Sequence, residues 1–371
     1  MKRILSFRKR KKSDAVYLLS LAVSVLAALI VGAVFLLCSG KDPLAGYAAL
    51  VRGAFGTKRL LGNTLAQAMV LCMTGLATAI GSRAGIFNVG GEGQLWLGGA
   101  ASVAVALWLD GASAWLVVPL CVLVSVTVGG AYAFVPGILK VKWRVNEVIT
   151  TLMLNSAAIY FCYYLVNGPM RAGGNTTKIA TETVNNAYRF TRLIKLSDLY
   201  STILYAAVVA FLIWYVMQKT SIGFEMKMTG ENGRFAFFSG IRHDRVQLLS
   251  MVASGAVCGL VGMFLVFGKN GAFTQTHSVE LYFDGMMVAM IMRYQPLGII
   301  LMSLFFGALD VGALEMQNIG IAGEIVLVVK SLIFFFMAAE NGILLALRSR
   351  KEKRKARAEA LLRAEQEALH G

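Results

Sequence analysis

The chain has 371 residues, of which 57% are hydrophobic and 15% are charged. Soluble domains usually hold about 45–50% apolar and about 25% charged residues, so the composition excludes an ordinary soluble protein. It predicts an all-α polytopic membrane protein. The net charge of +16 lies largely at the two ends, which favours contact with anionic lipid and argues against a nucleic-acid partner.

Both ends of the chain are basic. Seven Lys or Arg residues fall within positions 2–12, and eight more fall within 348–363. Cytoplasmic flanks of membrane proteins are enriched in Lys and Arg, so we expect both termini in the cytoplasm. This predicts a basic N-terminus at 1–14, a membrane domain at 15–346 and a basic tail at 347–371. The spacing of Ala and Leu in the tail favours a solvated helix, with a partner-binding helix as the alternative.

Ten apolar runs follow one another along the chain. They cover 16–38, 60–81, 92–109, 113–135, 147–166, 199–217, 248–268, 281–292, 297–313 and 323–345. A transmembrane helix needs about 20 such residues, so 281–292 is short and is either a tilted span or re-entrant. A further short helix is expected at 44–52, and Pro136-Gly137 is expected to break the chain after the fourth run.

Two cytoplasmic termini require an even number of spans. Ten spans satisfy this condition, and eight do so if the short run is re-entrant and one other run does not cross. Ten spans divide into two halves of five, which would then have inverted orientations, a common plan in transporters. Each half holds a polar break rich in small residues, at 88–93 and at 283–285.

The first of these breaks belongs to an unusual stretch, Gly85–Ala100. Five glycines fall within Gly85–Gly98, together with Asn88, Glu92 and Gln94. An acid is expensive to place in lipid, and loosened backbone is tolerated at membrane depth only when protein buries it or when it lines a cavity. The stretch is therefore expected either to line a transport pathway or to brace a helix break.

Two polar segments between runs are candidate docking surfaces. Residues 167–198 are expected outside, either as a plain connection or as a surface for a substrate-delivering protein. Residues 218–247 are expected inside and contain Phe235, Phe237 and Phe238 beside glycines. Such exposed rings need a partner surface, the membrane face or the base of the bundle.

The residues for enzymatic chemistry are missing. The chain has no G-x-x-x-x-G-K-[ST] phosphate loop and no metalloprotease or nucleophile motif. Its five cysteines all lie in apolar runs, and its three histidines are far apart, so we expect no metal site. A channel would need a repeated filter. An ion-coupled secondary transporter of a small polar solute stays open, since Glu92, Glu147 and Asp284 are candidate coupling acids.

Several motifs resemble a known family, the permease subunits of bacterial ABC importers in the branched-chain amino-acid, ribose and nucleoside permease superfamily. The resemblance covers about residues 16–345 and looks most like the nucleoside or simple-sugar type. Four stretches carry it: Ser82–Gln94, Asn146–Asn155, Gly223–Ile241, and Phe283–Ala289 together with Arg293–Gly298.

This resemblance implies a permease subunit of the bacterial cytoplasmic membrane that imports nucleosides or simple sugars by alternating access. It implies three partners: a cytoplasmic ABC ATPase, a second permease and an extracellular substrate-binding protein. ATP would be used by the ATPase, and this chain would bind no cofactor. Family members often carry Arg-Ala-x-Gly-x-Asn in the segment that couples to the ATPase, whereas this chain has Lys227-Met228-Thr229-Gly230-Glu231-Asn232.

Two sets of site residues follow. The resemblance implies that the ATPase is coupled through Gly230, Glu231, Asn232, Phe235, Phe237, Phe238 and Gly240. The polar side chains expected along the substrate pathway are Asn88, Glu92, Gln94, Asn146, Asn155 and Asp284, with Asn63 and Glu147 as further candidates; the alternative for each is that it caps or braces a helix break.

Overall fold

The computed structural model describes residues 23–173, 179–275, 280–323, 327–328 and 330–336. Apart from its helices, this part of the chain has only two isolated backbone bridges, Ala180 with Thr274 and Arg192 with Tyr200. The prediction of an all-α protein is thereby confirmed. The predicted ends 1–14 and 347–371 lie outside the described residues.

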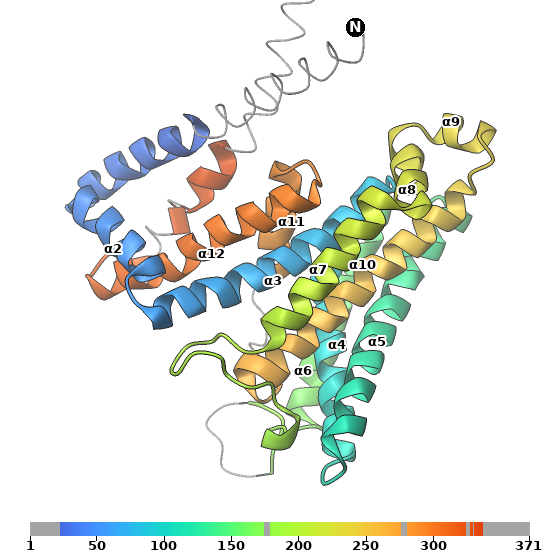
Figure 1. Ribbon diagram of the computed structural model, residues 1–371, viewed down its shortest axis with the longest axis horizontal. Helices are drawn as coiled ribbons and strands as arrows, with labels where there is room; N and C mark the ends of the chain where they lie inside the picture. The colour runs from blue at the N-terminus through green and yellow to red at the C-terminus, as the bar shows by residue number, and fades with distance from the viewer. Residues whose placement is uncertain (1–22, 174–178, 276–279, 324–326, 329, 337–371) are drawn as a thin grey trace, which may run out of the picture. The chain divides into compact units, whose positions relative to one another are not determined.

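The chain divides into two compact units, one of residues 49–315 and one formed by the residues before 49 and after 315. The larger unit contains nearly all the helices (Figure 1). These helices are α3 (Lys58–Arg83), α4 (Gly91–Trp108), α5 (Ala114–Trp143), α6 (Glu147–Asn167), α7 (Thr202–Lys219), α8 (Ser221–Glu231), α9 (Gly233–Phe238), α10 (His243–Leu265), α11 (Leu281–Ile291) and most of α12 (Pro296–Asn318). Helix α2 (Pro43–Phe55), predicted at 44–52, crosses the boundary between the units.

Six described helices are long and apolar enough to cross a membrane. They are α3, α5, α6, α7, α10 with the π-helical turn Val266–Asn270 that continues it, and α12. Helix α4 falls short because its first turn carries Glu92 and Gln94, and α11 falls short because it has only 11 residues. The chain is therefore a multi-pass membrane protein with at least six candidate spans.

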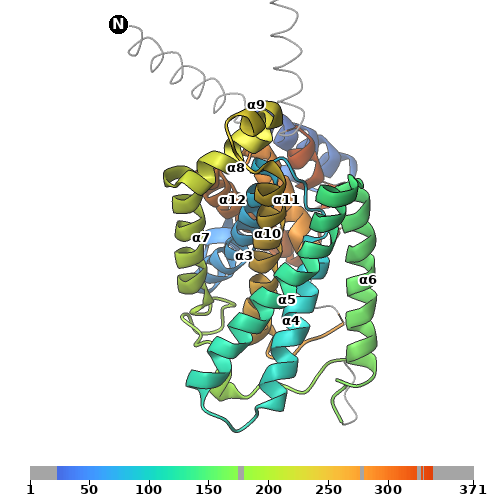
Figure 2. The same ribbon diagram turned by 90° about the vertical axis from the view of Figure 1, so that its right-hand side faces the viewer.

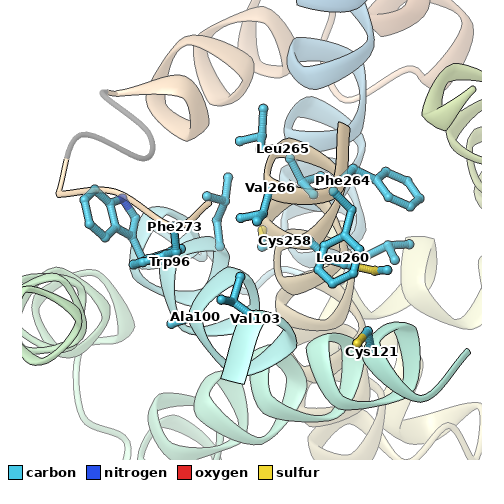
Figure 3. Close-up of a cluster of buried hydrophobic side chains, with 14 of the residues drawn as sticks. Trp96, Ala100, Val103, Cys121, Cys258, Leu260, Phe264, Leu265, Val266 and Phe273 are labelled. Atoms are coloured by element: carbon cyan, nitrogen blue, oxygen red, sulfur yellow. The ribbon is translucent and has the colours of Figure 1, made fainter. Parts of the chain in front are cut away.

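Helices α4, α5 and α10 form the packed centre of the larger unit. Figure 3 shows one continuous cluster of buried apolar side chains, in which Trp96 of α4 lies beside Phe273 and Val103 of α4 lies near Cys258 of α10.

Glycines bring these three backbones together. A side chain on Gly259 of α10 would collide with the backbone of Ser125 on α5, and one on Gly98 of α4 would collide with Gly259 itself. Close packing through small residues is the usual way in which membrane helices associate.

The expected break at Pro136-Gly137 is wrong. Helix α5 continues through Pro119 and Pro136 to Trp143, where Arg144 ends it with a left-handed backbone. Proline is tolerated inside membrane helices because neighbouring groups can satisfy the carbonyl that it frees. Gly137 packs against α10, because a Cβ atom at this position would lie 2.9 Å from Leu248 Cδ1.

The predicted connection 167–198 is attached to the segment that follows α10. The backbone N–H of Thr181 donates to the carbonyl of Phe273 (2.9 Å), and that of Val184 donates to the carbonyl of Gly271 (2.8 Å). The buried Tyr188 hydroxyl donates to the carbonyl of Ala112 (2.9 Å) in the turn between α4 and α5. The described part of this segment is therefore held on the end of the bundle.

The smaller unit is described only in part. Its helix Val23–Cys38 is joined to the start of α2 by a hydrogen bond from the Tyr47 hydroxyl to the carbonyl of Leu29 (2.6 Å). Gly46 packs closely against Ile321, since a Cβ atom on Gly46 would lie 3.1 Å from Ile321 Cδ1.

Candidate functional site

A buried polar network lies where the chain passes from α3 into α4. Asn88 is fully buried, and its side-chain amide donates to Gln94 Oε1 (2.8 Å) and to Ser254 Oγ of α10 (3.0 Å). Gln94 donates back to Asn88 Oδ1 (3.1 Å), and the N–H of Gly90 donates to the same oxygen (3.1 Å). Asn88 and Gln94 therefore pair side by side and hold the non-helical entry into α4 against α10.

Glu92 joins two helix N-termini. Its side chain is buried, with 3% of the residue exposed, and it lies in the first turn of α4. One carboxylate oxygen accepts from Trp96 Nε1 (3.3 Å), and the other accepts from the N–H of Tyr282 (2.8 Å) in the first turn of α11. Since helix N-termini carry partial positive charge, both helices stabilise an ionised Glu92.

Tyr282 closes the same network from α11. Its hydroxyl donates to the backbone carbonyl of Asn88 and accepts from Thr78 Oγ1 of α3 (3.2 Å). Its ring fills the space beside Gly91, where any side chain would overlap it. A glycine at this position is therefore required by close approach of the ring.

Helix α6 satisfies two further backbone donors of the break. Thr151 Oγ1 accepts from the N–H of Val89 (3.2 Å), and Asn155 Oδ1 accepts from the N–H of Gly93. Unpaired backbone groups are costly at membrane depth, so these two side chains allow α4 to begin inside the bundle.

The structure thus brings together four of the six residues predicted for the substrate pathway: Asn88, Glu92, Gln94 and Asn155. Asp284 lies half-buried in the first turn of α11. Asn146 lies apart from them on the exposed surface, where its side chain caps α6 by accepting from the N–H of Val148 (2.9 Å). The contacts of these four residues hold the break between α3 and α4 in place. Their position on a substrate pathway stays a prediction.

The predicted coupling segment forms two short helices at one end of the larger unit, α8 and α9 (Figure 2). Asn232 begins α9 by accepting from the N–H of Phe235 (3.0 Å), and Gly240 follows it with a φ of +79°. Phe235, Phe237 and Phe238 are 56%, 72% and 86% exposed. A six-residue helix thus presents three aromatic side chains outward.

A cationic recess of about 950 Å³ adjoins α9. Phe237 and Phe238 line it, together with Arg144, Arg234, Arg242, His243, Asp244 and Arg245. An acidic, partly apolar protein surface would complement this combination.

The coupling segment touches the entry to the buried network. Gly230, near the end of α8, packs on Gly85. A Cβ atom on Gly230 would lie 3.0 Å from the backbone nitrogen of Gly85. Gln247 Nε2 of α10 donates to the carbonyl of Gly85 (3.2 Å). Gly85 has a φ of +76° and begins the stretch that leads to Asn88, so α8 lies directly against the backbone of that stretch.

A polar cavity of about 420 Å³ lies near the opposite end of α3. Its polar lining includes Asn63, Gln67, Asp198, Lys269 and Asp310. Of these, only Asn63 was expected from the sequence. Asp310 could have been found, because an acid inside the apolar run 297–313 is by default a functional candidate.

A second cavity, of about 550 Å³, lies between α3, α7 and α12. Its lining holds no charged residue and consists almost wholly of apolar side chains, such as Phe211 and Leu301. A polar solute would find few partners there, which leaves the polar cavity as the better candidate. Within the described residues, no group of three or more His, Cys, Asp or Glu side chains could hold a metal ion.

Comparison with known proteins places the chain among transport components. The family described as "Branched-chain amino acid transport system / permease component" matches residues 60–338. The guanosine ABC transporter permease protein NupP of Bacillus subtilis is 32% identical over 91% of this chain and 97% of its own length. The nucleoside ABC transporter permease protein NupB of Lactococcus lactis is 33% identical over 86% and 90%.

A third similar protein is the glucose ABC transporter permease protein TsgB13 of Haloferax volcanii, 31% identical over 85% of each chain. No solved structure was found to match the chain.

Proposed function

Since the chain belongs to the branched-chain amino acid transport system permease family, we propose that it carries nucleosides across the cytoplasmic membrane as a permease subunit of an ABC importer. It is a transport component and not an enzyme. The family assignment decides against an ion-coupled secondary transporter. Simple sugars are the second candidate substrate, favoured by the similarity to a glucose permease.

An ABC permease works with an ATPase and a substrate-binding protein. We propose that a second, different permease completes the pore. The ATPase would use ATP, and this chain would bind no cofactor. Import would proceed by alternating access, in which closure of the ATPases moves the permease helices.

The observation that supports coupling is the exposed α9. Phe237 and Phe238 stand beside four arginines at the recess, and exposed aromatic and Arg side chains are typical anchors of protein interfaces. Gly230 on the adjacent α8 packs on Gly85. A displacement of α8 and α9 would therefore be transmitted through this contact to the stretch that enters α4.

We further propose ten spans in two inverted halves, with both termini in the cytoplasm. The meeting of the α4 and α11 N-termini at Glu92 supports two related halves, because paired discontinuous helices are typical of inverted-repeat transporters. The basic ends of the chain support the orientation. Under this topology 167–198 is external and available to the binding protein.

Uptake of labelled guanosine tests the function. A strain that depends on this chain should accumulate guanosine only when the chain and an active ATPase are both present. Energy-independent uptake, or uptake that persists without the ATPase, would contradict the proposal.

Phe238→Glu tests the coupling in the same cells. A buried charge at the interface should abolish most substrate-stimulated ATP hydrolysis, whereas Phe238→Leu, which keeps an apolar side chain, should retain it. Both variants should reach the membrane in wild-type amount, because Phe238 is exposed. Wild-type ATP hydrolysis by Phe238→Glu would refute the assignment of α9.

A further inference from the structure

Helix α6 lies at the edge of the larger unit, beside α4 and α5 (Figure 2). One face of this helix is fixed to the start of α4 by Thr151 and Asn155. The opposite face is exposed, and Tyr160 and Tyr164 on it are 70% and 65% exposed. In the membrane this face must therefore contact either lipid or a part of the transporter other than the described chain.

The exposed face of α6 carries a stripe of three hydroxyl groups, from Ser156, Tyr160 and Tyr164. These residues follow one another at intervals of four, a spacing that places side chains one above another on the same side of a helix. Thr151, on the other face, donates its hydroxyl to the carbonyl of Glu147 (2.7 Å). Within the described residues the three hydroxyls of the stripe have no such partner.

The hydroxyl stripe lies near the middle of the span. Helix α6 has 21 residues, which is about 31 Å of helix and matches a hydrocarbon core of about 30 Å. Its central residue is 157, so Ser156 lies at the centre and Tyr160 lies about 4.5 Å from it along the axis. Side chains of a helix lean toward its N-terminus, which directs the Tyr160 hydroxyl toward the central level and away from the nearer, C-terminal interface.

Helix α7 shows the pattern expected of a surface that faces lipid. Its exposed residues near the middle of the span include Val208, Phe211 and Leu212, which are apolar. Its exposed tyrosines, Tyr205 and Tyr215, lie near its two ends, where membrane proteins commonly place this residue. Helix α6 departs from this pattern, and a hydroxyl in hydrocarbon loses its hydrogen bonds to water without replacement. The hydroxyl stripe is therefore poorly suited to lipid.

A water-filled path between two permeases would suit the hydroxyl stripe. The wall of such a path consists of side chains that are exposed in each chain alone, so it forms no cavity within one chain. Tyrosine rings stack on nucleobases and similar flat rings, and a serine hydroxyl can both donate and accept a hydrogen bond. The stripe thus offers a solute one flat surface and several hydrogen-bonding groups, and none of its three side chains carries a charged group.

We propose that the hydroxyl stripe lines the path of the imported solute between the two permeases, and that the ring of Tyr160 stacks on a flat aromatic part of the solute. The ligand class is an uncharged molecule that combines an aromatic ring with hydroxyl groups, such as a purine nucleoside. This inference rests on the proposed function and adds to it one wall of the pore and a specificity-determining residue.

Thiol labelling tests whether the hydroxyl stripe contacts water. Ser156→Cys is introduced into the complete transporter in membranes, and its reaction with a small, charged, water-soluble thiol reagent is measured against the wild-type chain, which has five cysteines of its own. Alternating access opens the path to one side at a time, so the reaction is followed with and without ATP. The matched control is Val208→Cys, because Val208 is also exposed near the middle of a span.

The two cysteine variants should differ in reactivity. The thiolate is the reactive form of cysteine, and it forms in water and not in hydrocarbon. We expect Ser156→Cys to be modified and guanosine to slow its modification, whereas Val208→Cys should stay unmodified. An unreactive Ser156→Cys, or equal reaction of the two variants, would overturn the placement of the stripe on the path.

Guanosine uptake tests the stacking. Initial uptake is measured in cells that lack their own copy of this chain and is divided by the amount of chain in the membrane. Tyr160→Leu removes the ring, and loss of one stack on a base is worth about fivefold to a hundredfold, so we expect uptake to fall about fivefold or more. Tyr160→Phe keeps the ring and should retain most of the uptake. Phe161→Leu changes the neighbouring exposed ring, about 100° around the helix, and should leave uptake unchanged.

The outcomes separate this inference from the proposed function. Wild-type uptake by Tyr160→Leu, or equal losses in Tyr160→Leu and Tyr160→Phe, would overturn the stacking and leave the proposed function standing. Loss of the second permease from purified Tyr160→Leu, together with an unreactive Ser156→Cys, would assign the stripe to the contact between permeases and overturn its place on the path. Absence of guanosine uptake by the wild-type transporter would overturn the proposed function together with the ligand class.

Discussion

Replacing Glu92 by Gln tests whether the buried network is a brace. Both carboxylate oxygens accept hydrogen bonds, from Trp96 Nε1 and from the N–H of Tyr282. A Gln side chain has only one oxygen, so its NH2 group must face one of these donors. The variant keeps the size of the side chain and removes one acceptor and the charge.

The expected loss of stability follows from these contacts. Leaving a buried donor without its acceptor costs about 1–3 kcal/mol. This is a large part of the net stability of a typical protein.

Thermal unfolding of the detergent-purified transporter measures this loss. The unfolding midpoint of Glu92→Gln should fall by several degrees, while the transport rate per correctly folded molecule should change less. The control is Glu147→Gln, which weakens a partly buried ion pair with Lys140 (2.7 Å) at the start of α6 and should lower the midpoint less. An unchanged midpoint together with lost transport would refute the brace and place Glu92 on the substrate pathway.

Two further changes probe the same bundle. Gly259→Val should prevent folding or membrane accumulation, because a side chain there would collide with α5, whereas Gly173→Ala, with open space around it, should accumulate normally. Immunoblotting of membranes measures the amount of each variant. Normal amounts of Gly259→Val would contradict the close packing of α10 on α5. Asn155→Leu should lower the unfolding midpoint, since the N–H of Gly93 loses its acceptor at a cost of about 1–3 kcal/mol. Asn167→Leu, which alters an exposed cap (Asn167 Nδ2 to the carbonyl of Tyr163, 2.7 Å), should be nearly neutral, and equal effects of the two variants would argue against the brace.

The local pattern of the sequence predicted the helices well, because apolar runs of about 20 residues have few structures other than a helix. The runs 60–81 and 147–166 correspond to α3 and α6 within a few residues. The same local rule failed at Pro136, where proximity of Gly137 to α10 and the surrounding bundle allow a helix that proline would usually end in water.

The composition of Gly85–Ala100 indicated a special place but left two interpretations open. Asn88, Glu92 and Gln94 would stand out as polar residues in an apolar chain whether they line a transport pathway or brace a helix break. Only the positions of Ser254 and Tyr282, which are distant in sequence, show that Asn88 and Glu92 bind other parts of the protein.

The sequence by itself determined the class of protein, the order of its helices and its family, since each of these depends on local hydrophobicity or on short motifs. The tertiary structure decided which polar side chains meet. Asp310 lies 243 positions from Gln67, and no local pattern encodes that contact. It depends on the packing of α12 against α3, which is a property of the whole bundle.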